Sequence, residues 1–208
     1  MSEIGTYNDR LNSDWDFKMT EMGRFERGEG DVRDALEAVT DRLSELAVPY
    51  AVLGGMALQA HGYNRFTTDV DVLIDRDSLA MIHEALSGRG YLPVFAGSKN
   101  LRDTVRKVPI EFVIAGDYPG DGKPKPVAFP KPQDASVEIE GIRFVTLPKL
   151  VELKLASGMT NELRAKDLGD VIELITTLEL PPGFGEQLDP FVRGRFVDLA
   201  EKVAASRQ

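Results

Sequence analysis

Two aspartates, Asp69 and Asp71, lie one residue apart in the apolar segment 68–74. On a β-strand, residues i and i+2 point to the same face, so both carboxylates would project together while Val70 and Val72 pack into a core. Neighbouring carboxylates repel each other and are costly to desolvate unless a cation lies between them. Mg²⁺ takes carboxylate oxygens and phosphate oxygens as ligands. The aspartate pair therefore predicts a divalent-metal site.

A glycine pair, Gly54 and Gly55, follows the apolar run Tyr50–Leu53, and thirteen residues separate it from the first aspartate. Glycine allows a backbone to approach a ligand closely, and the N–H groups at the start of a helix favour anions. The pair therefore predicts a turn suited to phosphate groups beside the metal site. An ordinary tight turn next to a solvated strand is the alternative. The apolar residues around the aspartates favour a buried strand instead, on which carboxylates need partners.

The pattern LGG at 53–55, the spacer and the pattern DVDV at 69–72 resemble the signature of the DNA polymerase beta-type nucleotidyltransferase superfamily. This resemblance covers residues 32–115. The family adds a third acidic residue on a later strand, and Glu111 in PIEFVI is the candidate, although many relatives carry aspartate there. Residues 147–178 resemble the tail of the AbiEii-type and related minimal nucleotidyltransferases, some of which act as toxins.

The resemblance implies an enzyme that moves a nucleoside monophosphate from a triphosphate to an acceptor and releases pyrophosphate. It implies that Asp69, Asp71 and Glu111 hold two Mg²⁺ ions that clamp the attacking and leaving oxygens. Glu111 would also help to take the proton of the acceptor. The glycine pair would cradle the β- and γ-phosphates. The residues expected to contact the nucleotide are Gly54, Gly55, Arg65, Thr68, Lys154 and Lys166.

Simpler interpretations stay open for several basic residues. Arg65 suits a bidentate phosphate contact, or it is an exposed loop arginine that pairs with an acidic neighbour. Lys166 and Asp170 lie four residues apart, so a salt bridge along one helix face is an alternative to a phosphate contact. The Pro- and Gly-rich segment 116–133 predicts a long loop, and solvation of its lysines is favoured over contact with a phosphate backbone. These lysines are Lys123, Lys125 and Lys131.

Apolar periodicity and turn residues predict a mixed α/β fold: a mixed β-sheet core with packed helices and a helical C-terminal part. The expected organisation is a polar arm at 1–30, a nucleotidyltransferase core at 31–146 and helices packed on it at 147–208. The arm is either poorly ordered or docked on the body or on a second subunit, with Trp15 as its anchor. Helices are expected at 32–46, 55–61, 78–86, 148–157, 164–178 and 190–204. The buried stripe expected for the helix at 164–178 is Leu168, Val171, Ile172, Ile175 and Leu178. Strands are expected at 50–53, 68–74, 91–95, 103–108 and 110–115, with a hairpin over 137–145.

Composition narrows the class of protein. The 208 residues carry a net charge of −9, which disfavours non-specific binding of nucleic acid but leaves room for a localised basic patch. The chain has no cysteine, which excludes disulfides and thiolate metal sites, and two histidines are too few to suggest zinc. With no signal-like or long apolar segment, we expect a soluble cytoplasmic protein without a membrane partner.

Three hypotheses for function follow from these patterns. The first is an active Mg²⁺-dependent nucleotidyltransferase whose acceptor is RNA such as tRNA, a protein or a small molecule, including the toxin of a toxin–antitoxin pair. The second is a protein that kept the fold and binds nucleotide without turnover, which glutamate at position 111 in place of aspartate keeps open. The third is a partner-binding domain such as an antitoxin. The expected partners are a nucleoside triphosphate, the acceptor, and an antitoxin or a second copy of the chain.

Overall fold

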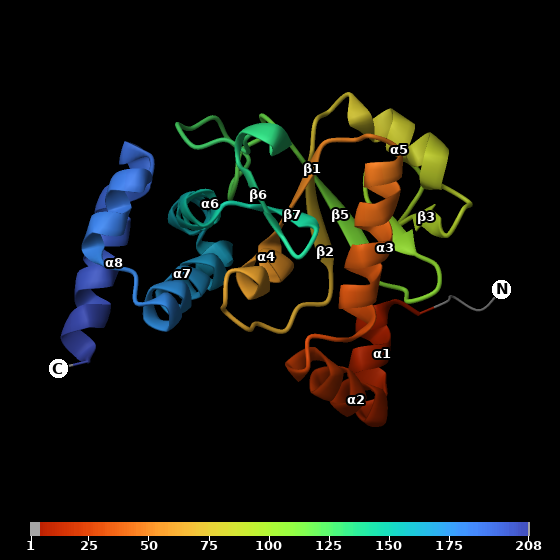
Figure 1. Ribbon diagram of the computed structural model, residues 1–208, viewed down its shortest axis with the longest axis horizontal. Coiled ribbons are helices and arrows are strands. Elements are labelled where there is room, and N and C mark those ends of the chain that lie inside the picture. The colour runs from red at the N-terminus through yellow and green to blue at the C-terminus, as the bar shows by residue number, and fades with distance from the viewer. Residues whose placement is uncertain (1–4, 208) are drawn as a thin grey trace.

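A seven-stranded mixed β-sheet forms the centre of the computed structural model, which describes residues 5–207 (Figure 1). The strands are β1 Tyr50–Leu53, β2 Val70–Ile74, β3 Tyr91–Pro93, β4 Leu101–Asp103, β5 Pro109–Ile114, β6 Ser136–Ile139 and β7 Ile142–Val145. Their order across the sheet is β3-β4-β5-β2-β1-β7-β6. β2 pairs antiparallel with β1 and parallel with β5, and β1 pairs parallel with β7.

Helices surround this sheet, which confirms the predicted mixed α/β fold with a helical C-terminal part. The α-helices of the described residues are α1 Tyr7–Ser13, α2 Trp15–Glu26, α3 Asp31–Glu45, α4 Gly54–Ala60, α5 Ser78–Leu86, α6 Leu147–Thr160, α7 Ala165–Leu178 and α8 Pro190–Ser206. Short 3₁₀ helices occupy Pro132–Asp134, Glu162–Arg164 and Pro182–Gln187. In Figure 1, α6, α7 and α8 lie to the left of the sheet, α3 crosses the right-hand part of the sheet, α5 lies at the upper right, and α1 and α2 lie below. None of the helices within residues 5–207 is long and apolar enough to cross a membrane.

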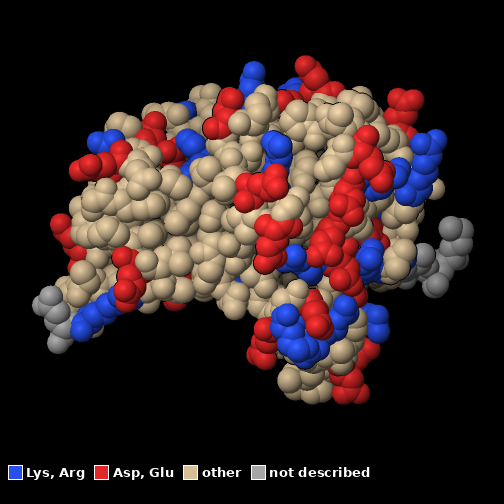
Figure 2. Space-filling view, viewed as in Figure 1, with Lys and Arg blue, Asp and Glu red and all other residues tan. Residues whose placement is uncertain are grey.

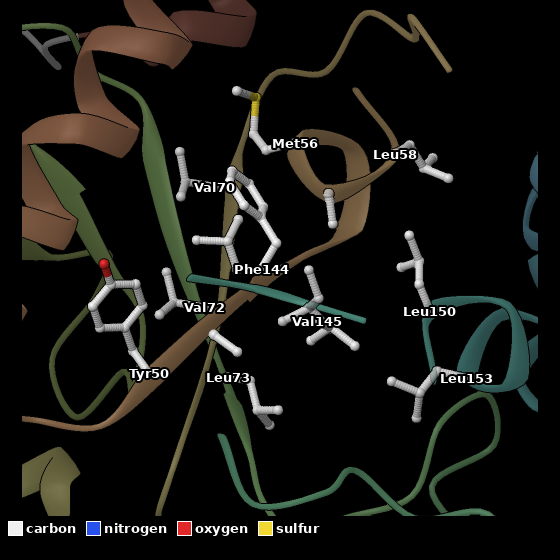
Figure 3. Close-up of a cluster of buried hydrophobic side chains, with 14 of the residues drawn as sticks. Tyr50, Met56, Leu58, Val70, Val72, Leu73, Phe144, Val145, Leu150 and Leu153 are labelled. Carbon is white, nitrogen blue, oxygen red and sulfur yellow. The ribbon is translucent and has the colours of Figure 1, made fainter. Parts of the chain in front are cut away.

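The central strand β2 is buried on both of its faces, which explains its apolar composition. Val70 and Leu73 are fully buried, and Figure 3 shows them in one cluster with Phe144 of β7 and Leu150 of α6. Burial of one such side chain contributes about 1.5–3 kcal/mol to stability. Residue 71 points to the same face of the sheet as Leu73, so the Asp71 carboxylate lies at the margin of this core.

The N-terminal segment docks on the body through α1 and α2, which was one of the alternatives expected for it. Tyr7 is buried, and its hydroxyl donates a hydrogen bond to Glu21 Oε2 at 3.0 Å. The same oxygen accepts from the backbone N–H of Asp31 at 2.8 Å. Trp15 is 69% exposed, so it does not anchor the arm on the body of this chain. The Tyr7 N–H group donates to the carbonyl oxygen of Lys107 at 3.3 Å, and Phe25 packs edge to face on Phe66. Residues 1–4 of the arm lie outside the described residues.

The hairpin of β4 and β5 turns earlier than the sequence predicted. We expected strands at 103–108 and 110–115 around Pro109, but β4 ends at Asp103 and Pro109 is the first residue of β5. The Asp103 carboxylate explains the difference, because its Oδ1 accepts from the N–H groups of Val105 and Arg106 at 2.7 and 2.8 Å. Such a side-chain turn competes with strand pairing, and residues 104–108 form the connection.

One predicted core position on α7 is also wrong. Ile172 was expected in the buried stripe of this helix, but it is 37% exposed. Leu174 is fully buried in its place, beside the correctly predicted Val171 and Ile175. The apolar residues of α7 cover a wide arc, and the packing of α6 and α8 against it decides which of them face the core.

Candidate active site

Three carboxylates meet where β2 lies between β1 and β5, and we call this group the acidic cluster. Asp71 of β2 is aligned with Glu111 of β5 in the parallel register, and Asp69 directly precedes β2. One carboxylate oxygen of each residue lies within 4.8 Å of those of the other two. Asp69 and Asp71 were predicted to share one face. The structure brings them together with Glu111, although β2 starts at Val70 rather than at residue 68.

The acidic cluster has the electrostatics of a cation site. Burial, the charge of Asp69 and the charge of Glu111 raise the pKa of Asp71 to about 7. Partial desolvation and the charge of Asp69 also raise the pKa of Glu111. Arg65, Lys154 and Arg164, which lie around the cluster, pair with Asp167 or Asp170 rather than with the cluster itself. Hard divalent cations prefer oxygen ligands, so the donor set fits Mg²⁺.

Gly54 allows the end of β1 to lie directly against Asp71. Leu53 pairs with Asp71 across the antiparallel β1–β2 register, so the next residue approaches the carboxylate. Gly54 has a φ of +66°, and a Cβ atom at this position would lie 1.8 Å from Asp71 Oδ2. Only glycine combines the left-handed backbone with this close approach.

Gly55 plays a similar part for Asp69 through Thr67. A Cβ atom on Gly55 would lie 2.5 Å from the Cβ of Thr67. The Thr67 hydroxyl donates to Asp69 Oδ1 at 2.7 Å and so orients that carboxylate. The sequence pointed to Thr68 as a site residue, but its neighbour Thr67 is the one that lines the cleft beside the cluster.

We expect Gly54→Ala to weaken divalent-metal binding by about tenfold or more, because the new methyl group displaces Asp71. The left-handed backbone adds a stability cost of about 1–2 kcal/mol. Gly141→Ala is the matched control, since Gly141 has a φ of +80° and a Cβ atom there would point into open space. The control variant should show only the stability cost of the left-handed backbone and should bind the metal as the wild type does. Mn²⁺ titration followed by electron paramagnetic resonance checks this, and wild-type Mn²⁺ affinity in Gly54→Ala would contradict it.

A buried ionic network on α6 and α7 borders the acidic cluster. The Lys154 ammonium group lies 3.1 Å from Asp167 Oδ1 and 2.6 Å from Asp170 Oδ2. Arg65 Nη1 reaches the same Asp170 oxygen at 2.8 Å. The expected bridge between Lys166 and Asp170 is therefore wrong, because Asp170 is buried and points toward Lys154 and Arg65. Lys166 is exposed on the rim of the cleft.

Arg164 joins this network and was not identified from the sequence. Its Nε donates to Asp167 Oδ2 at 2.8 Å, and Ser157 Oγ donates to the same oxygen at 2.6 Å. Burial opposes ionisation of Asp167, but Lys154, Ser157 and Arg164 together hold its pKa below the usual range. The Arg164 side chain is 57% exposed and lines the cleft, so it presents positive charge to a ligand.

These groups enclose a cleft of about 240 Å³, here called the polar cleft. β2 and β5 contribute negative charge from the acidic cluster, and α6, α7 and the segment between them contribute Lys154, Arg164 and Lys166. This pairing suits a ligand that carries phosphate groups together with a metal ion. The predicted site residues that line it are Gly54, Gly55, Arg65, Asp69, Asp71, Glu111, Lys154 and Lys166. The lining residues that the sequence did not reveal are Thr67, Leu163, Arg164 and Asp167.

Comparison with known proteins finds similar folds at low identity. No protein-family model matches the sequence, and no curated protein matches it. A nucleotidyltransferase-like antigenic protein from Paracoccidioides brasiliensis is 16% identical with a TM-score of 0.49, over 86% of this chain and 88% of that one. JHP933 from Helicobacter pylori is 16% identical with a TM-score of 0.47, over 85% and 93%. ANT(2″)-Ia in complex with adenylyl-2″-tobramycin is 11% identical with a TM-score of 0.44, over 80% and 92%. Activity therefore has to be inferred from the residues of the site.

Proposed function

We propose that this protein is a Mg²⁺-dependent nucleotidyltransferase that uses the acidic cluster as its metal site. The observation that carries the proposal is the convergence of Asp69, Asp71 and Glu111 within 4.8 Å, in a cleft that cationic side chains also line. Nucleotidyl transfer requires a metal site and a triphosphate site side by side, because catalysis depends on positioning and on charge neutralisation. The resemblance of the glycine pair and the aspartates to the nucleotidyltransferase signature supports the same reaction.

In the proposed reaction, an acceptor oxygen or nitrogen attacks the α-phosphorus of a nucleoside triphosphate. The bond between the α-phosphorus and the α,β-bridging oxygen breaks, and pyrophosphate leaves. When bound, Mg²⁺ would neutralise charge on the reacting phosphate and on the leaving group. Asp69, Asp71 and Glu111 would hold it, and Glu111, at the exposed end of the cluster, would receive the proton of the acceptor.

The other residues of the polar cleft would position the triphosphate. The backbone at Gly54 and Gly55 would lie against the β- and γ-phosphates, and Thr67 would keep Asp69 oriented. Lys166 and the edge of the Arg164 guanidinium group that does not face Asp167 would contact phosphate oxygens in the cleft. The contacts of Lys154, Arg65 and Thr68 with the nucleotide stay predictions, and the first two are already paired with Asp170.

The acceptor is RNA, a protein or a small molecule. Figure 2 shows a band of acidic side chains over α3, a surface unsuited to a nucleic-acid backbone. An RNA acceptor would therefore have to approach from another side of the molecule. A toxin role within a toxin–antitoxin pair rests on the likeness of residues 147–178 to the AbiEii-type proteins and stays a prediction.

Transfer of label from the α-phosphate tests the proposal. Each of the four α-labelled nucleoside triphosphates would be incubated with Mg²⁺, the protein and a cell extract that contains RNA, proteins and metabolites. We expect label to move into one fraction with the wild type and not with the Asp69→Asn/Asp71→Asn variant. If folded wild-type protein binds triphosphates but transfers no label from any of them, the enzyme hypothesis is contradicted. The second hypothesis, a protein that binds nucleotide without turnover, then takes its place.

A further inference from the structure

An apolar pocket opens beside the acidic cluster, on the face of the sheet that α6 covers. It has a volume of about 130 Å³. Its walls come from the sheet, from α6 and from the long loop at 116–131, and Figure 3 shows Leu150 and Leu153 directed from α6 toward the sheet. The apolar lining residues are Leu53, Val113, Pro119, Phe129, Leu150 and Leu153.

The apolar pocket and the polar cleft are neighbours. Gly54, Asp71, Lys154, Arg164 and Asp167 line both of them. A ligand whose phosphates lie in the polar cleft can therefore extend an apolar group into the pocket. A nucleotide has both parts, because it carries a charged phosphate chain at one end and a flat ring at the other.

The loop wall of the pocket is fixed in place. Gly120 has a φ of +78°, and a Cβ atom there would lie 2.7 Å from the carbonyl oxygen of Ser157 on α6. The Asn161 amide donates to the carbonyl oxygen of Gly120 at 3.2 Å. Lys125 donates to Thr160 Oγ1 at 2.9 Å and to the carbonyl oxygen of Pro119. Its side chain is 6% exposed, so the expectation of a solvated lysine is wrong at this position.

The volume of the pocket limits the ring that it can hold. A dry protein cavity of about 150 Å³ is known to hold benzene, while sites for drug-sized ligands span about 300–1,000 Å³. A pocket of about 130 Å³ is thus matched to a single six-membered ring and is small for a fused two-ring base. The Ser157 hydroxyl at its edge is already bonded to Asp167. Lys154 and Asp167 are paired with each other as well, and most of the remaining lining is apolar, so we expect size to matter more than hydrogen bonding in selecting the ring.

We propose that this pocket receives the base of the donor nucleotide and selects pyrimidines over purines. The inference rests on the proposed function, since it places the triphosphate in the adjoining polar cleft. Discrimination by the size of an apolar pocket amounts to about 10–200-fold.

Binding of α,β-methylene analogues of the four nucleoside triphosphates tests this inference, because these compounds cannot release pyrophosphate. Their dissociation constants would be measured by calorimetry with Mg²⁺, alongside inorganic tripolyphosphate, which has no base. We expect the CTP and UTP analogues to bind about tenfold or more tightly than the ATP and GTP analogues. Val113→Phe, which fills the pocket, should remove this preference while tripolyphosphate binding is kept. Val203→Phe changes a half-buried valine on α8 and is the matched control, which should keep the preference.

The outcomes separate the two proposals. Equal binding of all four analogues, or tighter binding of the purines, overturns the pyrimidine pocket and leaves the proposed function standing. The same holds if Val113→Phe retains the wild-type preference. A wild-type protein that binds neither tripolyphosphate nor any analogue with Mg²⁺ contradicts the proposed function and the pocket together.

Discussion

Asp71→Asn is expected to reduce metal-dependent nucleotidyl transfer by about 10³-fold or more while making the metal-free protein more stable. The loss of activity follows because Asp71 is the central carboxylate, aligned with Glu111 and oriented against Gly54. The gain in stability follows because the substitution removes a buried negative charge that Asp69 and Glu111 repel. Steady-state transfer assays and urea unfolding in the presence of a chelator measure the two effects.

Opposite changes in activity and stability distinguish a functional carboxylate from a structural one. Asp103→Asn serves as the contrast, because Asp103 is also buried on a strand but its carboxylate accepts two backbone N–H groups and pairs with Arg106. That variant should lose stability and keep the metal site. A less stable Asp71→Asn protein with unchanged transfer would show that the acidic cluster serves the fold.

Lys154→Met is expected to lower the free energy of unfolding by about 3 kcal/mol at pH 7. Lys154, Asp167 and Asp170 are all buried, so removal of the ammonium group leaves two carboxylates short of a partner away from water. The pKa of Asp167 is held low by this network, so the stability that its charge contributes is present above 3.8, the ordinary pKa of aspartate. That contribution is lost as the pH falls below this value. The difference in the free energy of unfolding between Lys154→Met and the wild type should therefore become smaller at such low pH.

An exposed pair provides the control for this prediction. Lys202 lies 2.9 Å from Asp198 on α8, with 69% of the lysine side chain exposed. Lys202→Met should change stability by about 0.5 kcal/mol or less. Urea denaturation measures the free energy of unfolding of both variants. The two values can be compared with the wild type when the m-value is unchanged. If Lys154→Met unfolds like the wild type but raises the KM for the triphosphate, Lys154 binds phosphate directly, as the family resemblance suggested.

Much of the site could be predicted because its strongest signals are local. The aspartates are two residues apart, so strand alternation alone brings them to one face. Both glycines were identified as site residues because a glycine pair after an apolar run predicts a turn that lies close to a ligand. The structure adds that Gly54 follows Leu53, whose register partner is Asp71. Glu111 was found through the family resemblance, which implies a third acidic residue on a later strand, and the apolar run around Glu111 is β5.

The remaining site residues depend on contacts between distant parts of the chain. Arg65 and Asp170 meet across 105 positions, and no local pattern couples them. Lys154 was expected to contact the triphosphate, while the structure pairs it with two aspartates of α7. The wall formed by the long loop was missed for the same reason. Its proline and glycine residues predicted irregular backbone correctly, but the anchors that hold the loop on α6, Thr160 and Asn161, lie beyond it in sequence.

The most direct test of nucleotidyl transfer follows the two ends of the triphosphate in one reaction. Wild-type protein would be given Mg²⁺, the responsive cell-extract fraction and triphosphate labelled at the α-phosphate or, in a parallel tube, at the γ-phosphate. We expect the α-label to appear in the acceptor and the γ-label to appear in pyrophosphate. Neither product should form with the Asp71→Asn variant. Appearance of the γ-label in the acceptor, or of the γ-label in orthophosphate with no α-label in the acceptor, would contradict nucleotidyl transfer and indicate phosphoryl transfer or hydrolysis.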